Sequence, residues 1–163
     1  PEKDRLSILD ICYEYENRLL KTQPGRLYDK VYETLSSLSK KYPLFIVSNC
    51  QCGYIEQFLR KTQLEAYIKD IECFGNTGKN KGENIRLLVK RNSLKAPVYI
   101  GDTKGDCDAS KEAGVPFIFA SYGFGNVTEY AESFILRVRE NRLILYKMFI
   151  SGQSEKKGGR KRF

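Results

Sequence analysis

Two short apolar runs with a single helix between them constrain the fold of this chain more than any other feature. Residues 97–100 and 115–120 are each predicted as a buried strand, and residues 106–114, which end in a glycine, as the helix that joins them. A strand, a helix and a second strand within about 25 residues form a compact βαβ unit, whose strands are parallel. The chain is therefore predicted to be an α/β protein.

Two carboxylates follow the first of these strands at a spacing of four residues. Gly101 ends the strand, Asp102 comes directly after it, and Asp106 opens the helix. Ligands of α/β sheets bind at the carboxyl ends of the strands, and magnesium takes one or two carboxylates together with a substrate phosphate. The alternative is a strand-to-helix turn in which Asp102 caps the helix. The glycine-rich residues 122–125 lie at the end of the second strand, where a loop of the site and a plain turn fit them equally well.

A similar pattern occurs upstream. Apolar residues at helical spacing predict a helix over residues 27–41, and residues 44–48 form an apolar strand that ends in Ser48, followed by Asn49. Residues 53–61 are predicted as the next helix. A hydroxyl group and free backbone amides at the start of a helix can hold a phosphate. The alternative is that Ser48 only caps this helix.

A third, weaker strand is predicted at residues 71–74, followed by a loop over 75–82 and a helix over 83–91. Lys81 stands where the loop meets the helix, so its ammonium group could reach a phosphate as a point charge. The alternative is a solvated surface lysine, which is the usual state of this residue type.

The order and spacing of these residues resemble the haloacid dehalogenase superfamily of phosphohydrolases, and within it the phosphoglycolate-phosphatase-like members. The similarity covers about residues 24–126, and its most specific part is Gly101-Asp102-x-x-x-Asp106. The resemblance implies a three-layer, Rossmann-like parallel sheet. It also implies hydrolysis of a small phosphorylated metabolite through an aspartyl-phosphate intermediate, with magnesium as cofactor.

The resemblance also implies a role for each candidate site residue. Ser48, with Asn49 beside it, would bind the transferring phosphoryl group, and Lys81 would neutralise its charge. Lys79 is the fallback for Lys81. Asp102 would hold magnesium, and Asp106 would support that metal site.

The chain departs from the family at its N-terminal side. Family members begin with a strand that ends in Asp-x-Asp, and the first of these aspartates is the nucleophile. The only Asp-x-Asp here is residues 106–108, inside a helix and downstream of the other motifs, so no residue of this chain fills that role. Residues 1–23 are expected to be the remnant of a helical cap domain, and because Pro1 is not an initiator methionine, we expect the chain to begin inside a longer protein.

The missing strand also has a structural consequence. In the superfamily it lies in the centre of the sheet, between the strands that end at Ser48 and Gly101. Each buried backbone group left unpaired would cost about 1–3 kcal/mol. The chain must therefore close the gap, borrow a strand from a missing segment or from a second chain, or be marginally stable.

The C-terminal part has no match to the family. Residues 134–136 are predicted as a short strand, residues 143–150 as a strand or a helix, and residues 151–163 as a disordered basic tail. The truncated core domain would then span residues 24–150.

Composition narrows the class of function. The absence of histidine excludes Ser-His-Asp and Cys-His catalysis and any zinc site with histidine ligands. Five cysteines without a disulfide framework favour a reducing, cytoplasmic compartment, and Cys50 and Cys52 are expected to be incidental thiols. No apolar run is long enough to span a membrane. Half of the net charge of +8 lies in the last ten residues, which argues against a specific nucleic-acid site.

Two functions from different classes remain. The first is a magnesium-dependent phosphohydrolase of which this chain is a fragment. The second is a catalytically inactive phosphatase-like module for binding or regulation, or a degenerate gene product. In either case we expect the chain alone to bind magnesium weakly and not to turn over phosphomonoesters.

Overall fold

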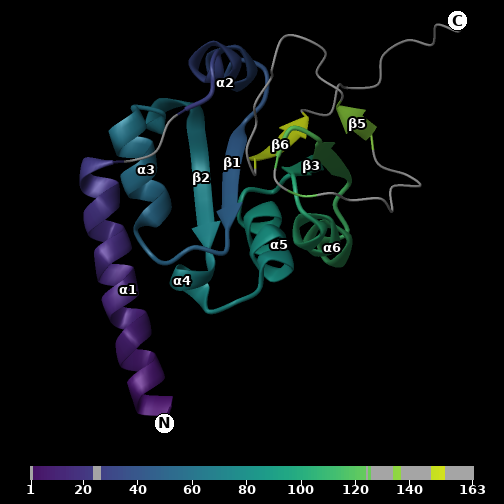
Figure 1. Ribbon diagram of the computed structural model, residues 1–163. Coiled ribbons are helices and arrows are strands. Elements are labelled where there is room, and N and C mark those ends of the chain that lie inside the picture. Colours follow the sequence, from purple (N-terminus) through teal and green to yellow (C-terminus); the bar gives the residue numbers. More distant parts are fainter. Residues whose placement is uncertain (1, 24–26, 124, 126–133, 137–147, 153–163) are drawn as a thin grey trace, which may run out of the picture.

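The computed structural model describes residues 2–23, 27–123, 125, 134–136 and 148–152 (Figure 1). Helices separate the four strands of residues 44–120, as predicted. The elements are α1 (Glu2–Thr22), α2 (Val31–Ser39), β1 (Leu44–Ser48), α3 (Tyr54–Thr62), a 3-10 turn (Glu65–Tyr67), β2 (Ile68–Cys73), α4 (Phe74–Thr77), α5 (Lys81–Arg91), β3 (Ala96–Gly101), α6 (Lys104–Ala113), β4 (Phe117–Ala120), β5 (Phe134–Leu136) and β6 (Met148–Gly152).

One sheet of six strands forms the centre of the molecule, in the order β2-β1-β6-β3-β4-β5. The pairs β1–β2, β3–β4 and β4–β5 are parallel. β6 is antiparallel to both of its neighbours, β1 and β3. The predicted α/β class with a parallel sheet is therefore confirmed, with one antiparallel strand in the middle.

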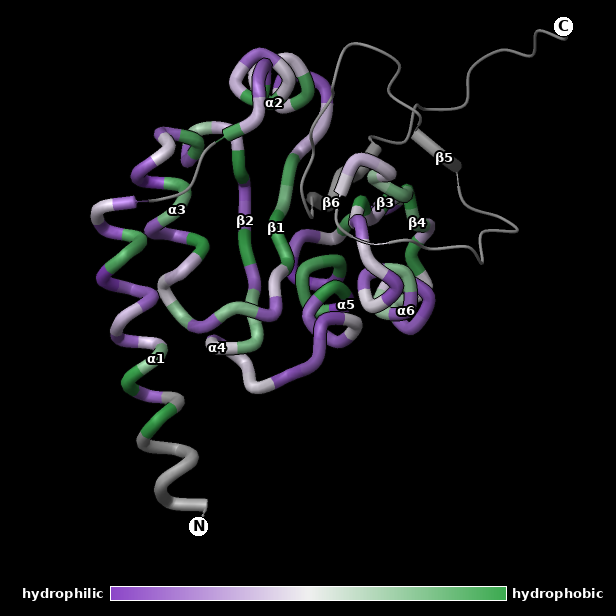
Figure 2. The backbone as a smooth tube through the Cα atoms, in the orientation of Figure 1, coloured by the Kyte–Doolittle hydropathy of each residue, from purple (hydrophilic) through white to green (hydrophobic). Residues whose placement is uncertain are grey.

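Helices cover both faces of this sheet, which gives the three layers expected (Figures 1 and 2). The side chains of β1 alternate between the two faces. Leu44 packs in one core with residues of α2 and α3, whereas Phe45 and Val47 pack in the other with residues of α5 and α6. All three are fully buried, which explains why β1 is a continuous apolar run: a parallel strand with helices on both sides has no solvent face.

α1 lies outside these layers, alongside α3 (Figure 1). The side-chain amide of Gln57 donates a hydrogen bond to the carbonyl of Asn17 (3.4 Å), and Leu20 is buried. Ile8, Ile11 and Tyr15 of the same helix are exposed.

Most predicted boundaries are close to those observed. The strand at 44–48 is confirmed, and β2 begins three residues before the predicted start at residue 71. The loop predicted over residues 75–82 is wrong in part, because it contains most of α4 and the first two residues of α5. Another difference is at α2, which starts at Val31 and not at residue 27. Lys30, the residue before this helix, has the left-handed conformation with φ of 63°. Because this conformation is not helical, the helix cannot begin earlier.

The place between β1 and β3, where the central strand was expected to be missing, holds β6. Ile150 lies opposite Leu44 of β1 and Val98 of β3. The chain therefore fills the gap with a strand from its own C-terminal part. For residues 148–150 the strand alternative is confirmed, and Ser151 and Gly152, assigned above to the tail, belong to β6. Residues 143–147 and 153–163 lie outside the described residues.

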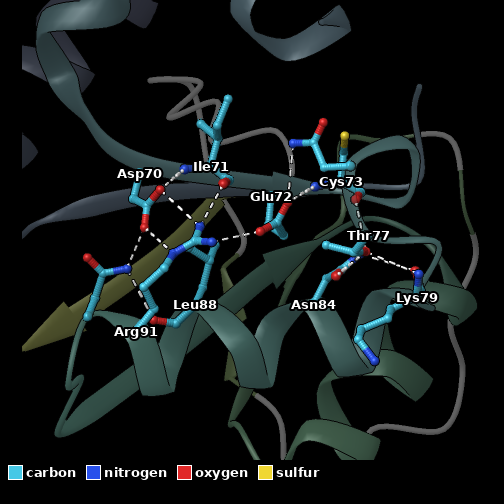
Figure 3. A network of polar contacts seen from close by, with 11 residues as sticks. Asp70, Ile71, Glu72, Cys73, Thr77, Lys79, Asn84, Leu88 and Arg91 are labelled. Carbon is cyan, nitrogen blue, oxygen red and sulfur yellow. Dashed lines mark hydrogen bonds and ion pairs between the residues drawn. The ribbon is translucent and has the colours of Figure 1, made fainter. Parts of the chain in front are cut away.

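A polar network joins β2 to α5 (Figure 3). The guanidinium of Arg91 donates to both carboxylate oxygens of Asp70, at 2.9 and 3.0 Å, and to Glu72 at 2.8 Å. Although burial opposes ionisation, hydrogen bonds from Asn92 and Arg91 outweigh it and lower the pKa of Asp70. Thr77 and Asn84 extend the network towards α4. These contacts hold the helix whose first residue is Lys81.

We expect Arg91→Met to lower the free energy of unfolding by about 1–3 kcal/mol, because it leaves the Glu72 carboxylate buried without its cation. Lys90→Met is the matched control and should change the free energy of unfolding far less.

The lowered pKa of Asp70 makes this effect depend on pH. The ionised Asp70 carboxylate stabilises the fold at pH values above its unfolded-state pKa, and this stabilisation is lost as the pH falls through its folded-state pKa. Urea titrations should therefore show the Arg91→Met deficit at pH 7 and a smaller one in acid, and equal effects at Lys90 and Arg91 would contradict this prediction.

Candidate active site

Asp102 lies at the carboxyl end of β3, and its side chain is only 1% exposed. The loop after β4 closes over it. A Cβ atom on Gly123 would lie 2.2 Å from Cβ of Asp102, and one on Gly125 would lie 2.2 Å from the Asp102 carbonyl oxygen. Only glycine fits at these two positions. The amide of Gly123 donates a hydrogen bond to the carbonyl of Ala120 (3.0 Å), so the chain turns here. The same glycines form the wall of the site around Asp102.

Asp106 lies one helical turn further on and is fully buried. Its Oδ2 accepts hydrogen bonds from the hydroxyl of Thr103 (2.7 Å) and from the backbone amides of Thr103 (3.2 Å) and Asp102 (3.3 Å). Thr103 accepts in turn from the Asp106 amide, which completes a capping box at the start of α6. Asp106 therefore fixes the turn that carries Asp102.

Lys81 reaches the same place from α5. Its Nζ lies 2.5 Å from Oδ1 of Asp106, and its side chain is 8% exposed. The capping box of Asn80 and Glu83 starts α5 at Lys81 and so directs this residue. Lys79 points elsewhere: it is about half exposed and lies 3.9 Å from Glu83. Of the two lysines, Lys81 is the one that joins the acidic pair.

Ser48 ends β1 at the same edge of the sheet as Asp102. Its Oγ accepts a hydrogen bond from the amide of Cys50 (3.3 Å), and Asn49 is exposed. The sheet order puts β6 between the strand of Ser48 and the strand of Asp102. The structure therefore brings Lys81 and Asp106 into direct contact next to Asp102, and places Ser48 on the same edge across the position of β6.

The described residues do not form a complete magnesium site. Among them, no group of three or more histidine, cysteine, aspartate or glutamate side chains is placed to hold a metal. Both oxygens of Asp106 already accept hydrogen bonds from protein donors. Since magnesium demands near-octahedral oxygen ligands, Asp102 and Asp106 would need further ligands. Their metal roles stay predictions.

Two residues of this site were not identified from the sequence. Tyr99 of β3 is fully buried, and its hydroxyl donates to Oδ1 of Asp106 (3.3 Å). A tyrosine inside an apolar strand signals a buried hydroxyl that needs a partner. Thr103 could have been found as well, because Thr-x-x-Asp at a helix start is a variant of the capping-box pattern.

The structure is that of an α/β protein whose sheet brings Lys81, Asp102 and Asp106 to its carboxyl edge, which is where proteins of this class bind their ligands. Within that class, the family model described as haloacid dehalogenase-like hydrolase matches residues 2–120. The chain belongs to this family. The matched part contains β1 to β4, whereas β5 and β6 lie beyond it.

Similar proteins include phosphatases and hydrolases of the same superfamily. The phosphoglycolate phosphatase of Aliivibrio fischeri is 27% identical over 117 residues, which is 68% of this chain and 51% of that protein. A haloacid dehalogenase-like hydrolase from Streptococcus pneumoniae has a similar structure, with a TM-score of 0.57 at 24% identity over 61% of this chain and 49% of the other.

The HAD-hydrolase YfnB of Bacillus subtilis, solved bound to magnesium, has a TM-score of 0.56 at 25% identity, over 63% of this chain and 48% of YfnB. The chain thus spans about half the length of the relatives that it matches. None of the helices described in the structure is both long and apolar enough to cross a membrane.

Proposed function

We propose that this chain carries the phosphate-binding half of a phosphohydrolase site that acts on a small phosphorylated metabolite in the cytoplasm. The observation that carries the proposal is the contact between Lys81 and Asp106 beside the buried Asp102, at the carboxyl edge of a family-matched sheet. The phosphoglycolate phosphatase relative supports a phosphomonoester as substrate.

Each residue has a chemical role in this proposal. Lys81 has three N–H donors, so one can bond Asp106 while the others meet phosphate oxygens. The Ser48 hydroxyl and the amides that follow it, beginning with Asn49, offer further donors on the same edge. Phosphoryl transfer depends mainly on such positioning and charge neutralisation. Magnesium, when bound, would neutralise phosphate charge further, with Asp102 as one of its ligands.

The nucleophile comes from outside residues 1–163 in this proposal. Asp108, the second acid of the only Asp-x-Asp, is about half exposed and pairs with Lys104 at 3.0 Å. The aspartyl-phosphate route therefore needs a carboxylate from a further segment of a longer protein or from a second chain.

A second candidate function is an inactive phosphatase-like module. One observation favours it: β6, which lies beyond the family-matched residues, occupies the centre of the sheet between β1 and β3. The sheet is continuous without a strand that carries a nucleophile. Such a chain could still bind phosphorylated compounds through Ser48 and Lys81.

A chimera separates the two candidates. The part of the Aliivibrio fischeri enzyme that precedes its matched segment is joined before Pro1, and residues 148–163 are removed so that the added strand can take the place that β6 occupies between β1 and β3. Release of phosphate from phosphoglycolate is then measured with magnesium. We expect no turnover by residues 1–163 alone and clear turnover by the chimera, because binding without a nucleophile lowers no barrier.

Substitutions in the chimera test the site residues. Asp102→Ala and Ser48→Ala should each reduce kcat/KM by about 100-fold or more, whereas Asp108→Ala, the exposed acid of the same segment, should leave it unchanged. A folded but inactive chimera would favour the binding module. Magnesium-dependent turnover by residues 1–163 alone, abolished by Asp102→Ala, would show that the nucleophile lies within this chain.

A further inference from the structure

The carboxyl ends of β1 and β2 carry three cysteines, and the loops that follow these strands are tied together. Ser48 and Cys73 are partners in the parallel register. The amide of Gly75 donates to the carbonyl of Cys50 (3.0 Å), and the Cys73 thiol donates to the carbonyl of Gln51 (3.7 Å). A Cβ atom on Gly75 would lie 2.1 Å from the backbone nitrogen of Cys52. The two loops are thus in direct backbone contact.

Two of these thiols meet inside this contact. The Cys50 side chain hydrogen-bonds to both the Ser48 side chain and the Cys73 thiol. Cys73 is fully buried, Cys50 is half-buried, and Cys52 is exposed. An oxidant therefore reaches Cys50 more easily than Cys73, while Cys73 is held within reach of the Cys50 sulfur. This arrangement of one accessible thiol and one adjacent resolving thiol suits disulfide exchange.

We propose that Cys50 and Cys73 form a modification site that closes to an intramolecular disulfide by exchange with a small disulfide such as oxidised glutathione. The Cys50 thiolate attacks the small disulfide, which forms a mixed disulfide and releases one small thiol. The Cys73 thiolate then attacks the Cys50 sulfur and displaces the second small thiol. Two protein thiols are oxidised, one small disulfide is reduced, and an excess of small thiol reverses both steps.

Closure would change the surroundings of Ser48. Once Cys50 is in a disulfide, its sulfur is a weaker acceptor for the Ser48 hydroxyl than the thiolate is, and Cys73 no longer donates to Gln51. The loop that presents the Asn49 and Cys50 amides would be covalently fixed to β2. The consequence for phosphate binding rests on the proposed function, whereas the disulfide itself does not.

The pH dependence of closure follows from the surroundings of the two thiols. Burial raises the pKa of Cys50, with a smaller contribution from the nearby Glu56 carboxylate, and burial raises that of Cys73 to about 11. Because the thiolate is the attacking species, closure should be slow at neutral pH and faster as the pH rises. The site would respond to sustained oxidation and not to brief exposure.

Mass spectrometry tests the site directly. The folded, reduced chain of residues 1–163 is treated with oxidised glutathione, its remaining thiols are alkylated, and it is digested with trypsin. We expect the tryptic peptides 42–60 and 70–79, which hold Cys50 and Cys73, to be linked. The link should persist in the Cys52→Ser variant, which is the matched control because Cys52 lies in the same peptide as Cys50. In the Cys73→Ser variant the reaction should end at a mixed disulfide on Cys50. A link that requires Cys52, or a stable mixed disulfide on Cys50 in the unsubstituted chain, would overturn the proposal.

An NMR titration with inorganic phosphate tests the connection to Ser48. In the reduced chain, phosphate should shift the amide signals that follow Ser48, and in the linked form these shifts should be reduced. Equal shifts in both forms would overturn the connection to Ser48. Absence of any shift in the reduced chain would count against the proposed function, while the disulfide is still judged by the peptide map alone.

Discussion

Ile150→Pro is expected to unfold much of the molecule. Ile150 lies in the middle of β6 and pairs with Leu44 on one side and Val98 on the other. Proline cannot donate to a ladder and is excluded from central strands. If β6 leaves the sheet, backbone groups of both β1 and β3 lose their hydrogen-bond partners, and each buried group left unpaired costs about 1–3 kcal/mol. A few such groups are enough to offset a typical total stability of about 5–15 kcal/mol. Circular dichroism during thermal unfolding measures the loss.

Ile135→Pro is the matched control, because it places the same substitution in β5 at the edge of the sheet. Ile135 pairs with Phe119 of β4, and β5 is the last strand in the sheet order. We expect Ile135→Pro to cost clearly less than Ile150→Pro. The reverse order, or a native-like Ile150→Pro protein, would show that β6 does not hold the central position.

Asp106→Asn is expected to cost about 3–5 kcal/mol, since it removes one partner of a buried ion pair. The amide has nearly the shape of the carboxylate, so the change is mainly the loss of charge beside Lys81, which is 8% exposed. The free energy of unfolding in urea measures the effect. Asp108→Asn is the control, because Asp108 pairs with Lys104 in solvent and should contribute below about 1 kcal/mol.

A double variant separates the pair from the surrounding packing. Lys81→Met removes the cation that Asp106→Asn leaves unpaired, so the double variant should recover much of the stability lost in Asp106→Asn. If the two losses simply add, the contact between Lys81 and Asp106 does not carry the effect. Hydrogen bonds from Tyr99 and Thr103 to Asp106 would then be the main contributors.

Local sequence patterns were sufficient to predict the four strands from β1 to β4, their parallel pairing and the position of Asp102 at the end of β3. β1 is a continuous apolar run because both of its faces are buried, and such a run is readable without a structure. Asp102 and Asp106 could be identified because they follow a strand directly and open a helix. Their place at the carboxyl edge then follows from the rule that ligands of α/β sheets bind there.

The choice between Lys81 and Lys79 depended on the tertiary structure. Both lysines lie in one polar segment, and only the packing of α5 against α6 shows that Lys81 faces Asp106 while Lys79 remains exposed. The contacts of Tyr99 with Asp106 and of Cys50 with Cys73 also depended on the tertiary structure, because in each case the two residues lie on different elements or loops.

The sequence by itself determined the α/β class, the parallel strands and the residues at their carboxyl ends, because these follow from local periodicity and from residues close in the chain. Only the tertiary structure decided what occupies the centre of the sheet. Pairing of β6 with β1 and β3 joins segments about 100 and about 50 residues apart, respectively. Short apolar segments such as residues 148–152 carry no local signal for their partners or direction, so their place depends on which backbone groups the rest of the fold leaves to be paired.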